Sequence, residues 1–163
     1  GTALHTFMQY ADYAAAAADV TAEADRLLAD DFLTAAQRQA LDLSRLSRFF
    51  ESALFARICE ASRIWREYAF TMPLPAKAFD DTLPEAAADE PIMIQGIADC
   101  VFEEDGALVI VDYKTDRVRD SAVLRERYKE QLSLYRRALS ETLSLPIKET
   151  LLYAFYTGET VEV

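Results

Sequence analysis

Two aspartates and a lysine stand where two apolar segments are expected to form a β-hairpin. Asp105-Gly106 lies between these segments and is a strong signal for a two-residue turn. Counting back from that turn places Asp99 directly opposite Asp112, because antiparallel partners pair one to one. Lys114 lies two residues beyond Asp112 and therefore projects from the same face. A one-residue bulge would change this register.

Such a pair of carboxylates calls for positive charge. The surrounding residues are apolar on both faces, as in a buried strand, so two neighbouring negative charges are costly there. Lys114 supplies one positive charge, and a divalent cation can supply the rest; all-oxygen ligands suit Mg²⁺. A metal so held can polarise a phosphodiester and lower the pKa of a bound water, while Lys114 orients the water or stabilises developing charge. An ion-pair cluster without catalytic role remains the alternative.

The elements that must position these residues are helices first and strands later. Thr2 is expected to cap a helix that runs through residues 14–18, and Thr34 with Gln37 has the form of a capping box. Apolar residues then recur at helical spacing over residues 41–58. Strands are expected over 66–72, 92–102, 108–113, 151–156 and 160–163, and Pro73 and Pro75 are expected to end the first of them. A mobile loop is expected over 76–90 and a long helix over 121–143. This order predicts a single α/β domain, 1–163, with a mixed central sheet and a helical N-terminal region.

The charge is strongly acidic but unevenly distributed. The net charge is −11, which argues against a general nucleic-acid binder. Residues 113–137 nevertheless carry eight basic against four acidic side chains, whereas residues 10–31 carry six acidic side chains and one basic. A basic band can steer a polyanion locally, although solvated helix faces would give the same pattern.

Two cysteines exclude a disulfide framework or a four-thiolate cluster within this chain. No signal peptide or apolar run of membrane-spanning length is visible, so a cytoplasmic protein is expected. The sequence opens inside a helix start, which suggests a piece of a larger protein. It contains no phosphate loop of the Gly-x-x-x-x-Gly-Lys-Ser/Thr type, so no ATPase is expected in it.

Four motifs, taken together and in order, resemble the PD-(D/E)XK nuclease superfamily in its RecB-like branch, over residues 1 to about 155. They are His5 with Gln9, residues 96–99 (Gly-Ile-Ala-Asp), residues 109–116 around Asp-Tyr-Lys-Thr, and residues 128–135 with the Gln-x-x-x-Tyr pattern. Within that branch the chain is similar to the C-terminal nuclease domains of AddA-type helicase–nucleases. The resemblance implies a restriction-endonuclease-like fold.

The resemblance also implies roles for individual residues. His5, Asp99 and Asp112 would bind the metal together with the backbone carbonyl of Tyr113, and Lys114 would be the catalytic lysine. Mg²⁺ is the expected ion, with Mn²⁺ as a substitute, and no iron–sulfur cluster is expected.

Tyr135, Glu67 and His5 keep two interpretations each. Gln131 and Tyr135 share one helix face, which the resemblance assigns to the active site and to DNA binding; Tyr135 could equally be a core residue. Glu67 fits a further acidic position of the family, or is an exposed strand acid. His5 could be a surface or capping residue.

The implied activity is Mg²⁺-dependent hydrolysis of single-stranded DNA as it leaves a helicase, in double-strand break repair by recombination. The implied partners are the DNA, the helicase region of the same parent chain and an AddB-type partner protein. A degenerate nuclease fold that only binds DNA or scaffolds a complex is one alternative. A stand-alone RecB-like exonuclease is another.

Overall fold

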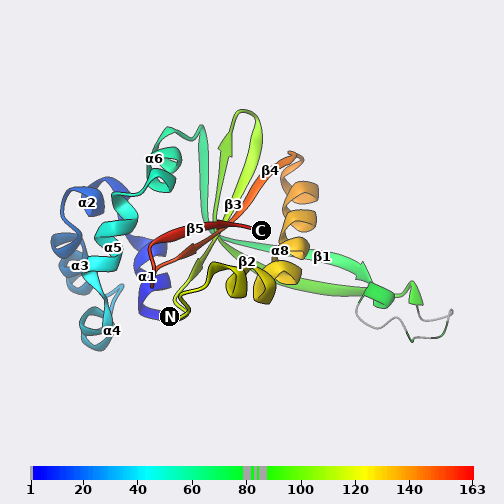
Figure 1. Cartoon of the computed structure of the whole chain (residues 1–163), viewed down its shortest axis with the longest axis horizontal. Coiled ribbons are helices and arrows are strands. Elements are labelled where there is room, and N and C mark those ends of the chain that lie inside the picture. Colours follow the sequence, from blue (N-terminus) through cyan, green and yellow to red (C-terminus); the bar gives the residue numbers. More distant parts are fainter. Residues whose placement is uncertain (1, 79–81, 83, 85–87) are drawn as a thin grey trace.

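The computed structural model describes residues 2–78, 82, 84 and 88–163, and its centre is a five-stranded mixed sheet with the strand order β1-β2-β3-β4-β5 (Figure 1). All neighbours are antiparallel except β3 and β4, which run parallel. The predicted α/β class with a mixed sheet is therefore confirmed. The strands are β1 (Arg63–Pro75), β2 (Pro91–Glu104), β3 (Ala107–Lys114), β4 (Ile147–Ala154) and β5 (Glu159–Glu162).

Six short helices precede the sheet and gather on one side of it (Figure 1). The expected continuous helix through residue 18 is wrong, because Asp12 adopts an extended conformation and caps a second helix through Ala15 N. The predicted capping box of Thr34 and Gln37 is confirmed. The helices are α1 (Thr2–Tyr10), α2 (Tyr13–Ala18), α3 (Val20–Ala29), α4 (Ala35–Ala40), α5 (Leu43–Phe50) and α6 (Ala53–Glu60).

A single long helix, α8 (Ser121–Leu143), makes the crossover between the parallel strands β3 and β4. Its bounds are those expected from the sequence. Asp120 caps its first turn through Ala122 N, and Ser144 ends it in the left-handed region at φ 53°. In Figure 1 this helix lies on the other side of the sheet from the N-terminal helices.

The sheet therefore has a core on each face. One is built between the N-terminal helices and residues such as Phe102, Val111 and Tyr113. The other lies between α8 and residues such as Val101 and Ile110. Successive residues of β3 alternate between the two cores, so Asp112 faces the α8 side while Tyr113 faces the N-terminal helices.

Strand β1 continues through both prolines that were expected to end it. Pro73 and Pro75 keep their pairing with β2. Met72, which precedes them, and Leu74, which lies between them, are buried. The strand is at the edge of the sheet, where the missing proline N–H costs no ladder bond. Ala76–Ala78 then form a short 3₁₀ turn. The expected mobile loop over 76–90 includes residues 79–81, 83 and 85–87, which lie outside the described residues.

At one point, β1 and β2 each change which of their alternating side chains face α8 and which face the N-terminal helices. Arg66 pairs with Cys100 and Tyr68 with Ala98, but the pair between them, Glu67 with Asp99, is missing from the ladder. Glu67 has a left-handed backbone, φ 49°. The irregularity therefore coincides with two acidic residues and turns the far parts of both strands under α8.

No helix in the ranges that the structure describes combines the length and apolar character needed to cross a lipid bilayer.

Candidate active site

The hairpin forms in the predicted register but stops one pair short of the two aspartates. Asp105 and Gly106 make the turn with φ 55° and 76°, and the ladder runs from Glu104–Ala107 to Cys100–Val111. Beyond it the side chain of Asp99 replaces the ladder, since its Oδ2 accepts the Tyr113 N–H at 2.6 Å.

Asp112 is buried and in contact with Lys114. Its side chain is 5% exposed, and Lys114 Nζ lies 2.6 Å from its Oδ2. Apart from this ammonium, the oxygen has no hydrogen-bond partner within the described structure. Burial, and next the charge of Asp99, raise the pKa of Asp112, while Lys114 lowers it. The negative charge of Asp112 is therefore unfavourable at this position, and the positive charge of Lys114 does not fully compensate for it.

Lys114 is held between a carboxylate and an aromatic ring. Its Nζ lies 3.7 Å from the centroid of the Tyr128 ring, a cation–π contact from α8. The Tyr128 hydroxyl donates to Asp116 Oδ2 at 3.0 Å, which fixes the plane of the ring. Neither Tyr128 nor Asp116 was predicted to have a role at the site. The only sequence signal was that Asp116 lies in the motif over 109–116 and Tyr128 in the motif over 128–135.

Helix α1 brings His5 to the ends of β2 and β3. His5 Nε2 lies 3.0 Å from Tyr113 O and 3.4 Å from Asp99 Oδ2. A carbonyl only accepts, so Nε2 carries the proton in this arrangement. Metal binding through Nε2 would require that proton to move to Nδ1 or leave.

Glu67 lies beside these groups. Desolvation by burial, and next the charge of Asp99, raise the pKa of Glu67, whereas His5 lowers it. The side chain is half-buried, not fully exposed. The irregularity in β1 thus brings a third carboxylate near enough to Asp99 and His5 for their charges to act on it.

Gln131 and Tyr135 face the sheet together from α8. Gln131 Nε2 donates to the Tyr135 hydroxyl at 3.0 Å, and the Tyr135 ring stands edge-on to Phe70 with centroids 5.1 Å apart. Among the described contacts, no hydrogen bond or ion pair joins these two residues to the aspartates or to Lys114. The structure therefore places them on the α8 side of the sheet, next to β1.

The donor chemistry fits a hard divalent cation. The convergent groups are carboxylates, the carbonyl of Tyr113 and the imidazole of His5, and the buried Asp112 Oδ2 has no described partner besides Lys114. Within the described part of the chain, however, no three His, Cys, Asp or Glu side chains lie close enough together to bind one metal ion. The Tyr113 carbonyl is therefore a candidate ligand beside the side chains.

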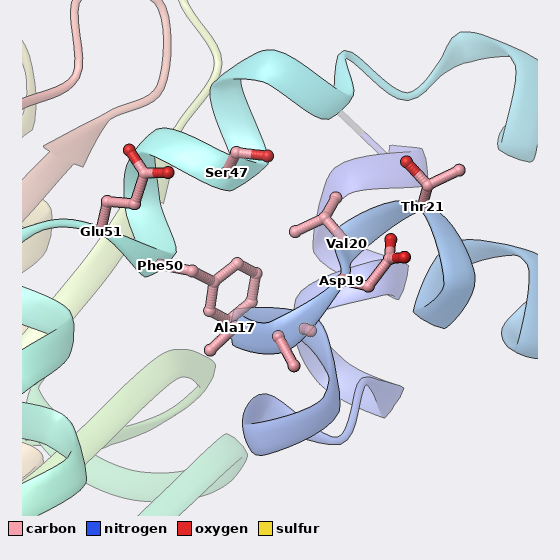
Figure 2. A pocket seen from close by; sticks show the side chains of 9 residues that line it. Ala17, Asp19, Val20, Thr21, Ser47, Phe50 and Glu51 are labelled. Atoms are coloured by element: carbon pink, nitrogen blue, oxygen red, sulfur yellow. The ribbon is translucent and has the colours of Figure 1, made fainter.

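A separate hollow of about 260 Å³ lies between α2, α3 and α5 (Figure 2). Phe50 projects into it, and its charged lining residues are Asp19 and Glu51. This hollow offers a phosphate no positive charge.

The comparisons with known proteins identify the family of this chain. The family model described as the PD-(D/E)XK nuclease superfamily matches residues 1–161. A protein of Acetivibrio thermocellus that is named as an ATP-dependent helicase/nuclease subunit is 39% identical over 97% of this chain and 13% of its own length. Proteins with the same name from Bacillus cytotoxicus and Clostridium acetobutylicum are 38% and 33% identical, over 99% and 100% of this chain.

The chain spans only 14% of the length of each of these last two relatives. The match of the family model, by contrast, covers nearly the whole chain and includes the helices, both faces of the sheet and the site. The mixed sheet flanked by helices is the restriction-endonuclease-like architecture predicted from the motifs. The chain belongs to the PD-(D/E)XK nuclease superfamily.

Proposed function

We propose that this chain is a divalent-metal-dependent deoxyribonuclease domain that hydrolyses phosphodiester bonds of single-stranded DNA. The observation that carries the proposal is the buried Asp112 carboxylate. Its pKa is raised by burial and by Asp99, and its Oδ2 has no partner besides the Lys114 ammonium within the described structure. A divalent cation between the aspartates would offset both costs.

The residues that would hold the ion are His5, Asp99, Asp112 and the carbonyl of Tyr113, with Mg²⁺ as the ion and Mn²⁺ as a substitute. When bound, the ion supplies Lewis acidity toward a phosphodiester and lowers the pKa of a water molecule. Asp99 also fixes the main chain of Tyr113 through the 2.6 Å hydrogen bond, which orients the carbonyl side of the same residue.

Lys114 is the proposed catalytic lysine. Its side chain is only 14% exposed, and its ammonium contacts Asp112 and the Tyr128 ring. From there it can donate to a phosphate oxygen as negative charge develops, or orient the attacking water. Gln131 and Tyr135 would contact the DNA from α8, and Glu67 would act beside Asp99 as a further acid.

The larger setting follows from the name that the relatives share. A helicase separates strands, so a nuclease in the same chain meets single strands. We therefore propose that residues 1–163 are the C-terminal nuclease domain of an AddA-type helicase–nuclease. It would act in the cytoplasm with an AddB-type partner protein, in double-strand break repair by recombination.

The test is cleavage of a labelled single-stranded oligonucleotide by the 163-residue chain with Mg²⁺, with Mn²⁺ and with chelator. Asp112→Ala is expected to lower the rate by at least about 100-fold. The matched control is Asp25→Ala, because Asp25 is exposed on α3 and its contact within the described structure is a surface ion pair with Arg38. Cleavage by Asp112→Ala at the rate of the unaltered chain would refute the proposal.

Calorimetry with Mn²⁺ separates the alternatives. A chain that neither binds Mn²⁺ nor cleaves DNA would be a degenerate nuclease fold with a binding or scaffolding role. Robust cleavage of free DNA ends by the isolated chain would instead favour a stand-alone exonuclease.

A further inference from the structure

We propose that a polar network on the opposite face of the sheet from the site positions His5 for the metal ion. This back-face network consists of Arg66, Tyr13, Tyr113 and the carbonyls of Met8 and Ala11. The inference rests on the proposed function, because it concerns the ligand that α1 would contribute.

The network lies directly behind the site. Arg66 precedes Glu67 on β1, and Tyr113 stands between Asp112 and Lys114 on β3. Neighbouring residues of a strand point to opposite faces. The two strands that present acids to the site therefore present an arginine and a tyrosine toward the N-terminal helices.

Arg66 closes the C-terminal end of α1. Its Nη1 donates to Ala11 O at 2.6 Å and lies 3.3 Å from Met8 O. The last carbonyls of a helix lack partners within the helix, and a cation near them is stabilising. The guanidinium also lies 4.6 Å from the centroid of the Tyr13 ring. Arg66 thus joins β1 to the end of α1.

Two phenols extend this connection to β3. The Tyr13 hydroxyl donates to Met8 O at 3.2 Å. Its single proton is then used, so in the 3.4 Å contact between the two hydroxyls Tyr113 is the donor. The end of α1 is thereby tied to β1 and β3 at once.

This arrangement decides where His5 lies. Leu4, Phe7 and Met8 bury the inner side of α1, but apolar contact is non-directional and leaves the rotation of a short helix loosely defined. The hydrogen bonds at Met8 and Ala11 are directional. His5 is one helical turn before Met8, so the network fixes the distance of His5 Nε2 from Asp99 and from the Tyr113 carbonyl.

The experiment uses the only histidine of the chain as its reporter. In the untagged 163-residue protein, the imidazole signals in an NMR spectrum belong to His5 without further assignment. The test variants are Arg66→Met, which removes the donor to α1, and Tyr13→Phe, which removes one hydroxyl. Arg66→Lys keeps the charge with fewer donors and is the conservative variant.

Two matched controls exist elsewhere in the fold. Arg57→Met removes an arginine that binds Glu104 and Glu149 near the hairpin turn, away from α1. Tyr153→Phe removes a buried hydroxyl that makes no hydrogen bond within the described structure. Both controls report what a general loss of stability does to the site.

We expect Arg66→Met to shift and broaden the His5 signals in the metal-free protein and to weaken Mn²⁺ binding about 10-fold. Tyr13→Phe should weaken it about threefold, and Arg66→Lys should recover part of the loss. Saturating Mn²⁺ should restore kcat, because the ligands themselves are intact. The two controls should change neither the His5 signals nor the Mn²⁺ affinity.

Unchanged His5 signals and Mn²⁺ affinity in Arg66→Met would overturn the inference, as would equal losses in the controls. If the unaltered chain binds no Mn²⁺, the proposed function fails instead. The His5 signals of the metal-free variants then still decide whether the network orders His5.

Discussion

Single residues at the site combine burial, like charge and backbone strain. Glu67 shows all three, because it is half-buried, lies close enough to Asp99 to feel its charge, and has φ 49°. A non-glycine residue in the left-handed region is uncommon, and such positions cluster at functional sites. The fold therefore tolerates Glu67 at this position against the preference of an isolated strand.

The pKa of Glu67 gives a prediction about stability. Because this pKa is raised in the folded state, the folded protein holds the proton more tightly than the unfolded chain does. The resulting contribution to stability is complete below the ordinary pKa of 4.5 and is lost as the pH rises through the folded-state pKa. In chelator, Glu67→Gln should therefore be more stable than the unaltered chain at pH 7 and no more stable at pH 3.5. Urea unfolding at both pH values measures this, and a less stable Gln variant at pH 7 contradicts it.

Tyr128 gives a prediction about Lys114. Tyr128→Leu removes the ring under the ammonium and should lower kcat about 10-fold, the size of a partly desolvated cation–π contact. Tyr128→Phe keeps the ring but loses the hydrogen bonds to Asp116, so about a threefold loss is expected. Single-turnover cleavage at saturating DNA and metal measures both. Equal losses in the two variants would show that the ring itself contributes nothing.

The sequence predicts some of these residues and not others for a physical reason. The positions of Asp99, Asp112 and Lys114 can be predicted from the Asp105-Gly106 turn and from the two-residue alternation of side chains along a strand. Glu67 was named only through the family resemblance, because its position depends on an irregularity in the β1–β2 pairing that a two-residue periodicity does not show. Tyr128 reaches Lys114 only through the tertiary packing of α8 on the sheet.

At the scale of elements, the close packing of the β1–β2 ribbon on α8 depends on Gly96. A Cβ at this position would collide with Cζ of Phe70, whose ring meets Tyr135 edge-on. The glycine therefore leaves space for a ring that in turn supports the Gln131–Tyr135 pair.

Gly96→Ala should displace the Phe70 ring, lower the free energy of unfolding by about 1–3 kcal/mol and reduce nuclease activity. Gly106→Ala is the control, since a Cβ there meets nothing within 4 Å and only the positive φ of 76° is unfavourable. It should cost about 1–2 kcal/mol while activity at 20 °C stays unchanged. Chemical denaturation and cleavage assays compare the two. Equal activity of both variants would separate Phe70 packing from catalysis.

Element boundaries were harder to predict than element types. The long helix over 121–143 has a strong cap and clear periodicity, and its bounds agree with the structure. The first helix does not, because Asp12 competes for the backbone within an alanine-rich segment that itself favours helix. Pro73 and Pro75 suggested a strand end only because the sequence does not show which strand is at the edge.

For the whole molecule, the question is how a chain with net charge −11 meets a polyanion. Nearly all of its basic side chains are engaged internally. Within the described part of the chain, Arg117 and Arg119 are the two whose groups make neither a hydrogen bond nor an ion pair. Both are exposed, and they follow Lys114 by three and five residues in the segment that leads to α8. The uncommitted positive charge is thus concentrated beside the site.

Replacing both, Arg117→Gln with Arg119→Gln, should weaken single-stranded DNA binding and make it less sensitive to salt. Each phosphate contact on a single strand contributes about 0.7 to the slope of log K against log salt, so a decrease of about 1.4 is expected. The control is Lys129→Gln with Arg137→Gln, because Glu126 and Glu141 already engage these charges. Fluorescence anisotropy with a labelled oligonucleotide, in Ca²⁺ to limit cleavage and over a series of KCl concentrations, measures the slopes. If the control pair changes the slope as much as the test pair, the basic band acts as a whole and the segment after Lys114 has no special part in holding the strand.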